Sequence, residues 1–355
     1  MFRAMEQKRN YFKKTLSVIG RIGAVLLANL IIIVFALYMA MLIVAKGPSK
    51  TARELFVLSV NETSLAGFLS NIFLSKEEVD EILAIKENAA SGEIKSGEIT
   101  NPSMIKVDTK DSNDEDKTGV SPVKDPTEGI ETIEIHTDTY KGMLMIVNDP
   151  KRVFVGVPDA YGEDRIGLSL RQMIEKYDAI GGVNAGGFLD PGGVGKGGVP
   201  MGIVIKDSKI MWGEEDTKYS ITGFDKDGVL YVGSMTGKEA LAAGIVDAVS
   251  FGPALVINGE PVNSDYALGI SRNPRTAIAQ RADGSILLLV IEGRSLSSFG
   301  ATFDDLIEIF MTYGAVNATN LDGGYSSLMV YNGGELTTNA YAYGERILPT
   351  AILVK

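Results

Sequence analysis

The longest apolar stretch of the chain lies near its N-terminus, from Ile22 to Ala45, and contains no charged residue. A helix of this length, rising about 1.5 Å per residue, can cross the roughly 30 Å hydrocarbon layer of a bilayer. The stretch is apolar on every side, whereas a helix that packs on a soluble core is apolar along one stripe. The pattern therefore predicts one transmembrane helix over residues 22–45.

The charges that flank this stretch predict its orientation. Residues 1–21 contain six basic residues and one acidic residue. Because cytoplasmic flanks are enriched in Lys and Arg, we expect residues 1–21 in the cytoplasm and the rest of the chain outside it. A cleaved signal peptide is the alternative interpretation, but the apolar run is longer than a usual signal segment and no small-x-small cleavage motif follows it. The sequence favours a single-pass signal anchor in the cell membrane.

Two segments of different character follow the predicted anchor. Residues 46–90 have a partly apolar, helical pattern, with Ser75 as the expected N-cap and Glu78 completing a capping box. This segment is either a juxtamembrane stalk or a segment on the membrane surface. Residues 91–129 are acidic and polar, and they contain too few apolar side chains to offset the entropy cost of ordering. We expect a disordered linker there; an apparent calcium loop within it lacks the glycine and distal glutamate of an EF-hand.

Short segments rich in branched residues, bounded by Gly, Asp or Asn, begin at residue 130 and are typical of strands. They are TIEIHT, GMLMIVND, RVFVGV, GIVIKD, GVLYVG, ALVING and SILLLVIEG. Two amphipathic helices interrupt them, and their apolar faces contain Leu170, Met173, Ile174 and Tyr177 in the first and Phe303, Leu306, Ile307, Phe310 and Met311 in the second. Residues 130–355 are therefore predicted to form an α/β domain of the mixed α+β kind, with strand-rich mixed sheets and packed helices.

Composition excludes several classes of function. The net charge of -11 offers no clustered basic surface for nucleic acid. The chain has no cysteine and one histidine, His136, which removes thiolate sites and multi-histidine metal sites. Any bound metal would therefore need oxygen ligands.

Polar residues at the ends of apolar strands are the candidates for chemistry. An asparagine followed by a glycine pair occurs twice, as Asn184 with Gly186 and Gly187 and as Asn320 with Gly323 and Gly324. Consecutive glycines at a strand end let a ligand approach the backbone N–H groups, although a pair of tight turns is the plainer interpretation. Asp322 lies inside the second of these segments.

Charged residues end or precede two further apolar strands. Arg272 and Arg275 precede one strand and are candidates for presenting guanidinium forks to a phosphate. Glu292 and Arg294 close another, and a surface ion pair between them is the alternative interpretation. Charged groups at the ends of rigid strands are a common way to build an active site.

The ordered motifs VNAGGF, FGPALVINGE, NPRTAIAQ-RADGSILLLVIEGR and NATNLDGGYSSLM resemble those of the phosphodiester glycosidase family. The resemblance covers about residues 130–355, and NLDGG-x-SS is its most specific part. It carries over to Asn184, Gly186, Gly187, Gly252, Pro253, Arg275, Thr276, Glu292, Gly293, Arg294, Asn320, Asp322, Gly323, Gly324, Ser326 and Ser327. The chain departs from the family pattern at Glu292, where Asp is frequent, and at Gly187-Phe188, where an aromatic pair is frequent.

The resemblance implies hydrolysis of a sugar-1-phosphodiester in a cell-surface or exported glycopolymer. A phosphodiester is a permanent anion, so Arg275, together with Arg294 and glycine N–H groups, is expected to bind it. Asp322 is the first candidate and Glu292 the second for a nucleophilic or water-activating carboxylate. The asparagines of the two repeated segments are expected to bind sugar hydroxyls, and Gly252 and the two serines of the last motif are assigned to the substrate site.

Some alternatives stay open at this point. No cofactor is required, but the two carboxylates with Asn320 are a possible oxygen site for Ca²⁺ or Mg²⁺. A serine hydrolase on Ser326 or Ser327 would need His136 as its base, and the segment GYSSL is not a nucleophile elbow. A non-catalytic module that binds anionic wall polysaccharide would use the same arginines and glycine loops. The natural glycan, the bond that is cleaved and the oligomeric state do not follow from the sequence.

Overall fold

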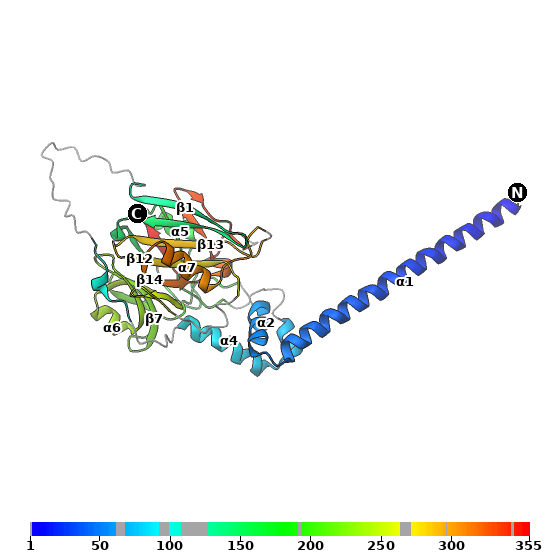
Figure 1. The fold of residues 1–355 in the computed structure, drawn as a ribbon, viewed down its shortest axis with the longest axis horizontal. Helices are drawn as coiled ribbons and strands as arrows, with labels where there is room; N and C mark the ends of the chain where they lie inside the picture. Colours follow the sequence, from blue (N-terminus) through cyan, green and yellow to red (C-terminus); the bar gives the residue numbers. More distant parts are fainter. Residues whose placement is uncertain are drawn as a thin grey trace.

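The computed structural model describes residues 2–61, 68–91, 99–107, 127–190, 194–262, 271–295, 297–341 and 344–355. A long helix projects from one side of the molecule, and a sheet-rich domain forms its body, with three shorter helices between the two (Figure 1). The N-terminal helices are α1 (Phe2–Lys46), α2 (Lys50–Asn61), α3 (Phe68–Phe73) and α4 (Lys76–Ser91).

Helix α1 contains the predicted membrane span. Its segment Gly20–Lys46 has a mean hydropathy of 2.7 and is long and apolar enough to cross a bilayer. The C-terminal end of α1 is held by Arg53 of α2, whose guanidinium Nε donates to the carbonyl oxygen of Ala45 at 2.8 Å and whose Nη2 donates to that of Gly47 at 3.1 Å. The last carbonyls of the helix, which have no partner within it, thereby gain donors.

Helices α2, α3 and α4 pack on the end of α1 around a small apolar cluster. Its buried members are Ala45, Val57, Phe73, Leu74, Val79 and Ile82. The predicted capping box at the start of α4 is confirmed: the Ser75 amide donates to Glu78 Oε2 at 2.8 Å, and the Glu78 amide donates to Ser75 Oγ at 3.2 Å. The hydrogen bond from the Ser75 amide, with a smaller contribution from Lys46, lowers the pKa of Glu78.

Residues 99–107 form a strap that lies along the sheet domain. The Thr100 amide donates to the Val232 carbonyl oxygen at 3.1 Å, and the Val232 amide donates to Thr100 Oγ1 at 2.9 Å. Farther along, the Lys106 amide donates to the Ala282 carbonyl oxygen at 2.8 Å, and Ile105 is buried in the domain core. Residues 99–107 belong to the predicted linker. In the structure they pack on the domain because the Ile105 side chain is buried there, between the backbone hydrogen bonds of Thr100 and Lys106.

The rest of the predicted linker is described only where it meets the domain. Residues 92–98 and 108–126 lie outside the described residues, so the prediction of disorder for them stays a prediction.

Three antiparallel sheets make up the domain, and every strand pair in the described ranges is antiparallel. The first sheet has the order β1 (Ile130–His136), β2 (Lys141–Val147), β13 (Ile286–Ile291), β12 (Arg275–Arg281), β14 (Ala315–Leu321), β10 (Ala254–Ile257) and β11 (Glu260–Pro261). The second has the order β16 (Gly334–Glu335), β15 (Met329–Tyr331), β4 (Gly181–Asn184), β17 (Ala351–Val354) and β3 (Val153–Gly156). The third has the order β6 (Lys209–Trp212), β5 (Val204–Lys206), β9 (Ile245–Ser250), β7 (Lys218–Asp225) and β8 (Leu230–Thr236).

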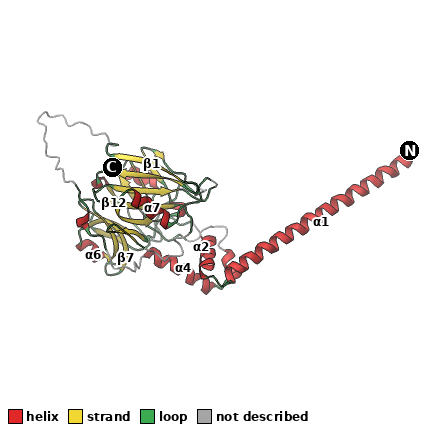
Figure 2. Ribbon diagram, viewed as in Figure 1, coloured by secondary structure: helices red, strands yellow, loops and turns green. Residues whose placement is uncertain are grey.

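Helices cover the outer faces of these sheets. Helix α7 (Phe303–Thr312) packs on the first sheet, α5 (Leu170–Lys176) on the second and α6 (Gly237–Ala242) on the third. Branched side chains from all three sheets meet in a central core. Figure 2 shows the strands gathered in the body of the domain, with α1 outside it. This arrangement confirms the predicted mixed α/β class.

Both predicted amphipathic helices are present. The second begins at the N-cap Thr302, where the Asp305 amide donates to Thr302 Oγ1 at 3.1 Å, and the chain leaves it through Gly314 at a φ of +76°. The left-handed conformation at that position favours glycine.

The strap makes a direct prediction about stability. Replacing Ile105 by Ala removes a buried side chain and should lower the free energy of unfolding of a fragment from residue 99 onward by about 2 kcal/mol. Denaturant unfolding measures this. The neighbouring Met104 is 37% exposed, so Met104→Ala is the matched control and should have little effect. Equal stability of the Ile105→Ala variant and the unmodified fragment would contradict the packing of the strap.

Candidate functional site

The motif residues gather at one edge of the first sheet because its strands are antiparallel. Strand β12 begins where β14 and β13 end: Thr276 pairs with Leu321, and Arg275 pairs with Ile291. The start of β10 lies at the same edge. We call this edge the site edge. Residues that are far apart in the chain therefore meet at it, as the strand-end pattern predicted.

Asn184 ties the second sheet to the site edge. Its side chain is fully buried, and its Nδ2 donates to the Asp322 carbonyl oxygen at 2.6 Å. Its Oδ1 accepts from Thr276 Oγ1 at 2.7 Å and from the Leu328 amide at 3.2 Å. The Asp322 amide in turn donates to the Ala185 carbonyl oxygen at 2.8 Å. Asn184 therefore holds the segment after β4 and the loop after β14, which contains Asp322 and Leu328, against each other.

The second asparagine of the repeated pattern lies on the opposite face of the first sheet. Leu321 points into the central core, so its neighbour Asn320 points the other way. Asn320 Nδ2 donates to the Gly252 carbonyl oxygen at 2.9 Å, while its Oδ1 is buried without a hydrogen-bond partner among the described residues. The two asparagines therefore do not converge on one point.

The glycines of both loops allow close approach of protein segments. A Cβ on Gly187 would lie 2.8 Å from the Phe251 ring, and one on Gly323 would lie 2.8 Å from the Pro274 carbonyl oxygen. Gly324 has a φ of +61°, a left-handed conformation that a side chain would strain. These contacts favour the tight-turn interpretation for the glycine pairs.

Amides of these loops donate to protein acceptors. The Gly186 amide donates to Thr350 Oγ1 at 2.9 Å, the Gly187 amide to the Ser250 carbonyl oxygen at 3.4 Å and the Gly324 amide to the Pro274 carbonyl oxygen at 2.9 Å. These three N–H groups stabilise the loops. In this conformation they donate to protein oxygens, so they do not bind an anion as predicted from the sequence.

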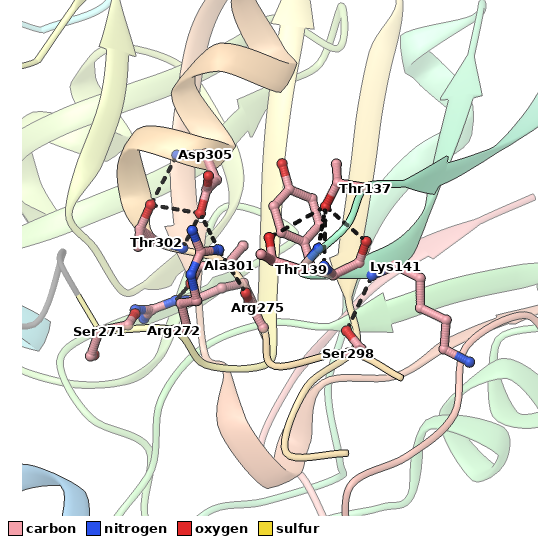
Figure 3. A network of polar contacts seen from close by, with 12 residues as sticks. Thr137, Thr139, Lys141, Ser271, Arg272, Arg275, Ser298, Ala301, Thr302 and Asp305 are labelled. Carbon is pink, nitrogen blue, oxygen red and sulfur yellow. Dashed lines mark hydrogen bonds and ion pairs between the residues drawn. The ribbon is translucent and has the colours of Figure 1, made fainter. Parts of the chain in front are cut away.

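Arg275 extends toward the N-terminus of α7 and toward Ala301, which precedes that helix (Figure 3). Its Nε donates to the Ala301 carbonyl oxygen at 3.1 Å, its Nη2 donates to the Ser271 carbonyl oxygen at 2.9 Å, and its guanidinium carbon lies 4.3 Å from the centre of the Phe303 ring. The side chain is 8% exposed. Arg275 therefore holds the loop before β12 against α7.

Arg272 lies in the same network and binds a carboxylate. Its Nη1 is 3.0 Å from Asp305 Oδ2, an oxygen that also accepts from the Thr302 amide at 2.8 Å (Figure 3). The structure thus corrects the expected pair of phosphate forks, because both guanidinium groups have partners in the protein and extend over the α7 face of the sheet.

Glu292 also binds protein groups with both carboxylate oxygens. Its Oε2 lies 3.1 Å from Lys141 Nζ, and its Oε1 accepts from the Thr338 amide at 2.7 Å. The carbonyl oxygen of the same residue accepts from Ser298 Oγ at 2.6 Å. The ion pair considered for Glu292 is present, but its partner is Lys141 on β2 and not Arg294.

Of the two motif arginines, Arg294 is the exposed one, and it lies beside the Asp322 loop. It has a φ of +58°, and its guanidinium carbon lies 4.4 Å from the centre of the Tyr325 ring. Its Nη2 is 3.4 Å from Asn273 Oδ1, and the guanidinium borders Gly324. Asp322 is itself partly exposed. A cation and a carboxylate are thus presented at the same loop.

From this point aromatic rings and guanidinium groups form a continuous row of contacts that was not predicted from the sequence. The ring centres of Tyr325 and Tyr341 are 5.7 Å apart, and the Arg346 guanidinium carbon lies 4.9 Å from the Tyr341 ring and 5.2 Å from that of Phe188. Arg346 is 3% exposed and lies 2.7 Å from Asp190 Oδ2. Arginine is seldom buried this deeply unless its charge is paired. The pairing of Arg346 is seen only in the structure.

The two serines of the last motif are buried. Ser326 is 6% exposed and Ser327 3% exposed, and Ser327 Oγ has no hydrogen-bond partner among the described residues. His136 lies on β1, and three strands separate β1 from β14 in the first sheet. The serine hydrolase alternative is therefore not assembled.

A metal site is not evident at this edge. Within the described residues, no group of three or more His, Cys, Asp or Glu side chains is placed to hold a metal ion. The possible Ca²⁺ or Mg²⁺ site stays a prediction.

Known proteins resemble this chain in sequence and in fold. The SPbeta prophage-derived uncharacterized protein YomE of Bacillus subtilis (strain 168) is 31% identical over 172 residues, which are 45% of this chain and 26% of that protein. The chain thus spans about a quarter of that relative's length. The catalytic domain of zebrafish N-acetylglucosamine-1-phosphodiester alpha-N-acetylglucosaminidase, solved in a form auto-inhibited by its pro-peptide, has a TM-score of 0.54 at 19% identity, over 64% of this chain and 83% of that one.

A putative exported protein of Burkholderia pseudomallei gives a TM-score of 0.45 at 16% identity, over 61% of this chain and 74% of that one. The family model described as phosphodiester glycosidase matches residues 177–355, half of the 355-residue chain. This range contains Asn184, Arg294, Asp322 and the other candidates at the site edge. The chain belongs to the phosphodiester glycosidase family.

Proposed function

We propose that the chain hydrolyses a sugar-1-phosphodiester at the site edge, with Arg294 as the principal anion-binding group and Asp322 as the reacting carboxylate. The observation that carries this proposal is the exposed Arg294 guanidinium stacked on Tyr325 beside the Asp322-Gly323-Gly324 loop. Family membership supports the reaction class, and the contacts of the other candidates support the choice of these two residues.

The division of roles between the two arginines rests on how far each side chain is exposed. A phosphodiester keeps its negative charge at every physiological pH, so a guanidinium fork can bind two of its oxygens at once. Arg275 is buried and binds two backbone carbonyls, whereas Arg294 is exposed. Glu292 binds Lys141 and the Thr338 amide and so joins protein segments. Asp322 lies in the most specific motif of the family resemblance, in the loop that borders the Arg294 guanidinium, and we therefore propose it as the reacting carboxylate.

The chemistry needs one carboxylate because the leaving group is a phosphate monoester, a stable anion. Asp322 then acts as the nucleophile or as the base that activates water. Asn320 Oδ1 and Ser327 Oγ are buried polar atoms that can still form hydrogen bonds, and they are proposed to bind substrate hydroxyls or a bridging water. Arg294 and the partly exposed Tyr325 and Tyr341 would line the substrate side of the loop, with the buried Arg346 behind Tyr341.

The N-terminal helices support a membrane-anchored form of the enzyme. Ala45, the last residue of the apolar run, is fully buried in the cluster that α2 and α4 complete. Removal of α1 as a signal peptide would expose this cluster, which favours an uncleaved anchor. With the basic N-terminus in the cytoplasm, the sheet domain is extracytoplasmic, and a phosphodiester-linked capsular, teichoic-type or exported polysaccharide is the proposed substrate class.

The carboxylate assignment is tested by turnover. A fragment from residue 99 onward, which keeps the strap, should release phosphomonoester from members of a panel of sugar-1-phosphodiesters and nucleotide sugars. Asp322→Asn should abolish release without abolishing substrate binding, because the amide keeps the shape and loses the reactive charge. Glu292→Gln is the matched control and should retain turnover, since its Oε1 can still accept from Thr338.

Loss of turnover in Glu292→Gln alone, with the fold intact, would exchange the two roles. A folded fragment that binds the panel and turns over no member would contradict hydrolysis and indicate a polysaccharide-binding module. Parallel reactions with a chelator determine metal dependence.

The anion-binding assignment separates the two arginines. Arg294→Gln should reduce kcat/KM by roughly 10- to 100-fold, the effect of losing one charged hydrogen-bonding group, with the melting temperature unchanged. Arg275→Gln should instead lower the melting temperature, because Arg275 connects the loop before β12 to α7. Thermal unfolding and initial rates of both variants check this. A stable Arg275→Gln variant with impaired binding would restore the role that the sequence predicted.

The role of Asn184 is tested by stability. Asn184→Ala leaves three buried partners without their hydrogen bonds and should lower the free energy of unfolding by about 2 kcal/mol or more. Thr276→Val removes one of those bonds and should have a smaller effect. Denaturant unfolding compares the two. An Asn184→Ala variant of unchanged stability and raised KM would show that Asn184 binds the substrate directly.

A further inference from the structure

One face of α1 is apolar at helical spacing and packs on the short helices. Tyr38, Met41, Leu42 and Ala45 lie three, four and seven residues apart, so they form one stripe on α1. Met41 and Leu42 pack on the cluster in which Ala45 is buried, and the ring centre of Tyr38 lies 5.2 Å from that of Phe73. Helix α3 ends at Phe73, so its end lies beside the part of α1 that is occupied by Tyr38.

Charged groups lie at the C-terminal end of α1, where the proposed anchor would leave the hydrocarbon layer of the membrane. We call this position the charged level. Lys46 Nζ pairs with Glu78 Oε2 at 3.3 Å, and Arg53 binds the carbonyl oxygens of Ala45 and Gly47. Tyr38 precedes Ala45 by seven residues, which is about 10 Å along a helix. The contact between Tyr38 and Phe73 therefore lies about 10 Å to the membrane side of this charged level.

The outer face of α3 is apolar and uncovered. Phe68 is 63% exposed and Ile72 is 54% exposed, and their spacing of four residues places them on one face of the helix. The described residues of α3 carry no charge. Ile43, near the end of α1, is similarly exposed, at 66%. If α1 is the anchor, the medium around Ile43 is lipid.

We propose that α3 is inserted into the outer boundary of the bilayer, with Phe68 and Ile72 in contact with lipid acyl chains. The inference rests on the proposed anchoring by α1. Lipid is the occupant because α3 ends beside Tyr38, inside the apolar run of α1, and its exposed face is apolar and uncharged. A depth of about 5–10 Å is usual for helices that lie in the membrane interface. The protein then has two membrane contacts, which restrict the tilt of α2 and α4 against the bilayer.

The absence of cysteine makes a site-directed test direct. Single cysteines are introduced into the full chain by Ile72→Cys and Phe68→Cys, with Ile43→Cys as the lipid reference and Asp80→Cys on the exposed face of α4 as the aqueous control. Each variant carries a nitroxide and is reconstituted in vesicles of phosphatidylcholine and phosphatidylglycerol. Collision rates with oxygen, which concentrates in lipid, and with a nickel chelate, which stays in water, give the depth of each label.

The oxygen-to-nickel ratio at residues 68 and 72 should exceed that at residue 80 several-fold and approach that at residue 43. A ratio at both positions equal to that at residue 80, with residue 43 in lipid, would overturn the insertion of α3 and leave the anchor intact. A water-exposed label at residue 43 would overturn both. Hydrolysis is measured on the fragment that lacks these helices, so its failure is a separate result. Both replaced side chains are exposed, and circular dichroism verifies that each variant is folded.

Discussion

The geometry of the site edge depends on the buried amide of Asn184. This side chain joins the end of β4, in the second sheet, to the start of β12 and the loop that follows β14, in the first sheet. A buried amide with its hydrogen bonds made is rigid, because any displacement leaves donors or acceptors without partners in a medium that contains no water to replace them. The position of Asp322 therefore follows from the packing of two sheets, and the loop that carries it needs no stabilisation from a ligand.

The two motif arginines, Arg275 and Arg294, have different roles in the structure. Arg275 is the first residue of β12 and alternates with Thr276, so the two side chains point to opposite faces of the sheet. Thr276 reaches the Asn184 side of the sheet and Arg275 the α7 side. Arg294 stands outside any strand and is directed by its left-handed backbone and by the Tyr325 ring. Planar stacking on an aromatic ring orients a guanidinium while leaving its edge able to form hydrogen bonds.

Much of the fold was predictable from the pattern of the sequence, since the long apolar helix, the capping box at Ser75 and the strand ends each have a local cause. The gathering of the motifs at one edge followed from strands that end in polar residues. The direction of Arg275 did not, because it depends on which face of β12 meets α7, a tertiary fact. Arg346 was also missed: its significance comes mainly from Phe188 and Asp190, which are more than 150 residues away in sequence. The strap at residues 99–107 was assigned to the linker because one buried isoleucine in a polar segment gives no periodic signal.

The place where the strap attaches has a mechanical consequence. It binds β8 and the turn between β12 and β13, which is the end of the first sheet opposite the site edge. Tension on the proposed membrane tether would reach the sheet domain away from the site edge, where Thr100 and Lys106 hold the strap. Release of the strap would lengthen the connection between α4 and the domain. The loops around Asp322, at the other end of the sheet, would not be strained by it.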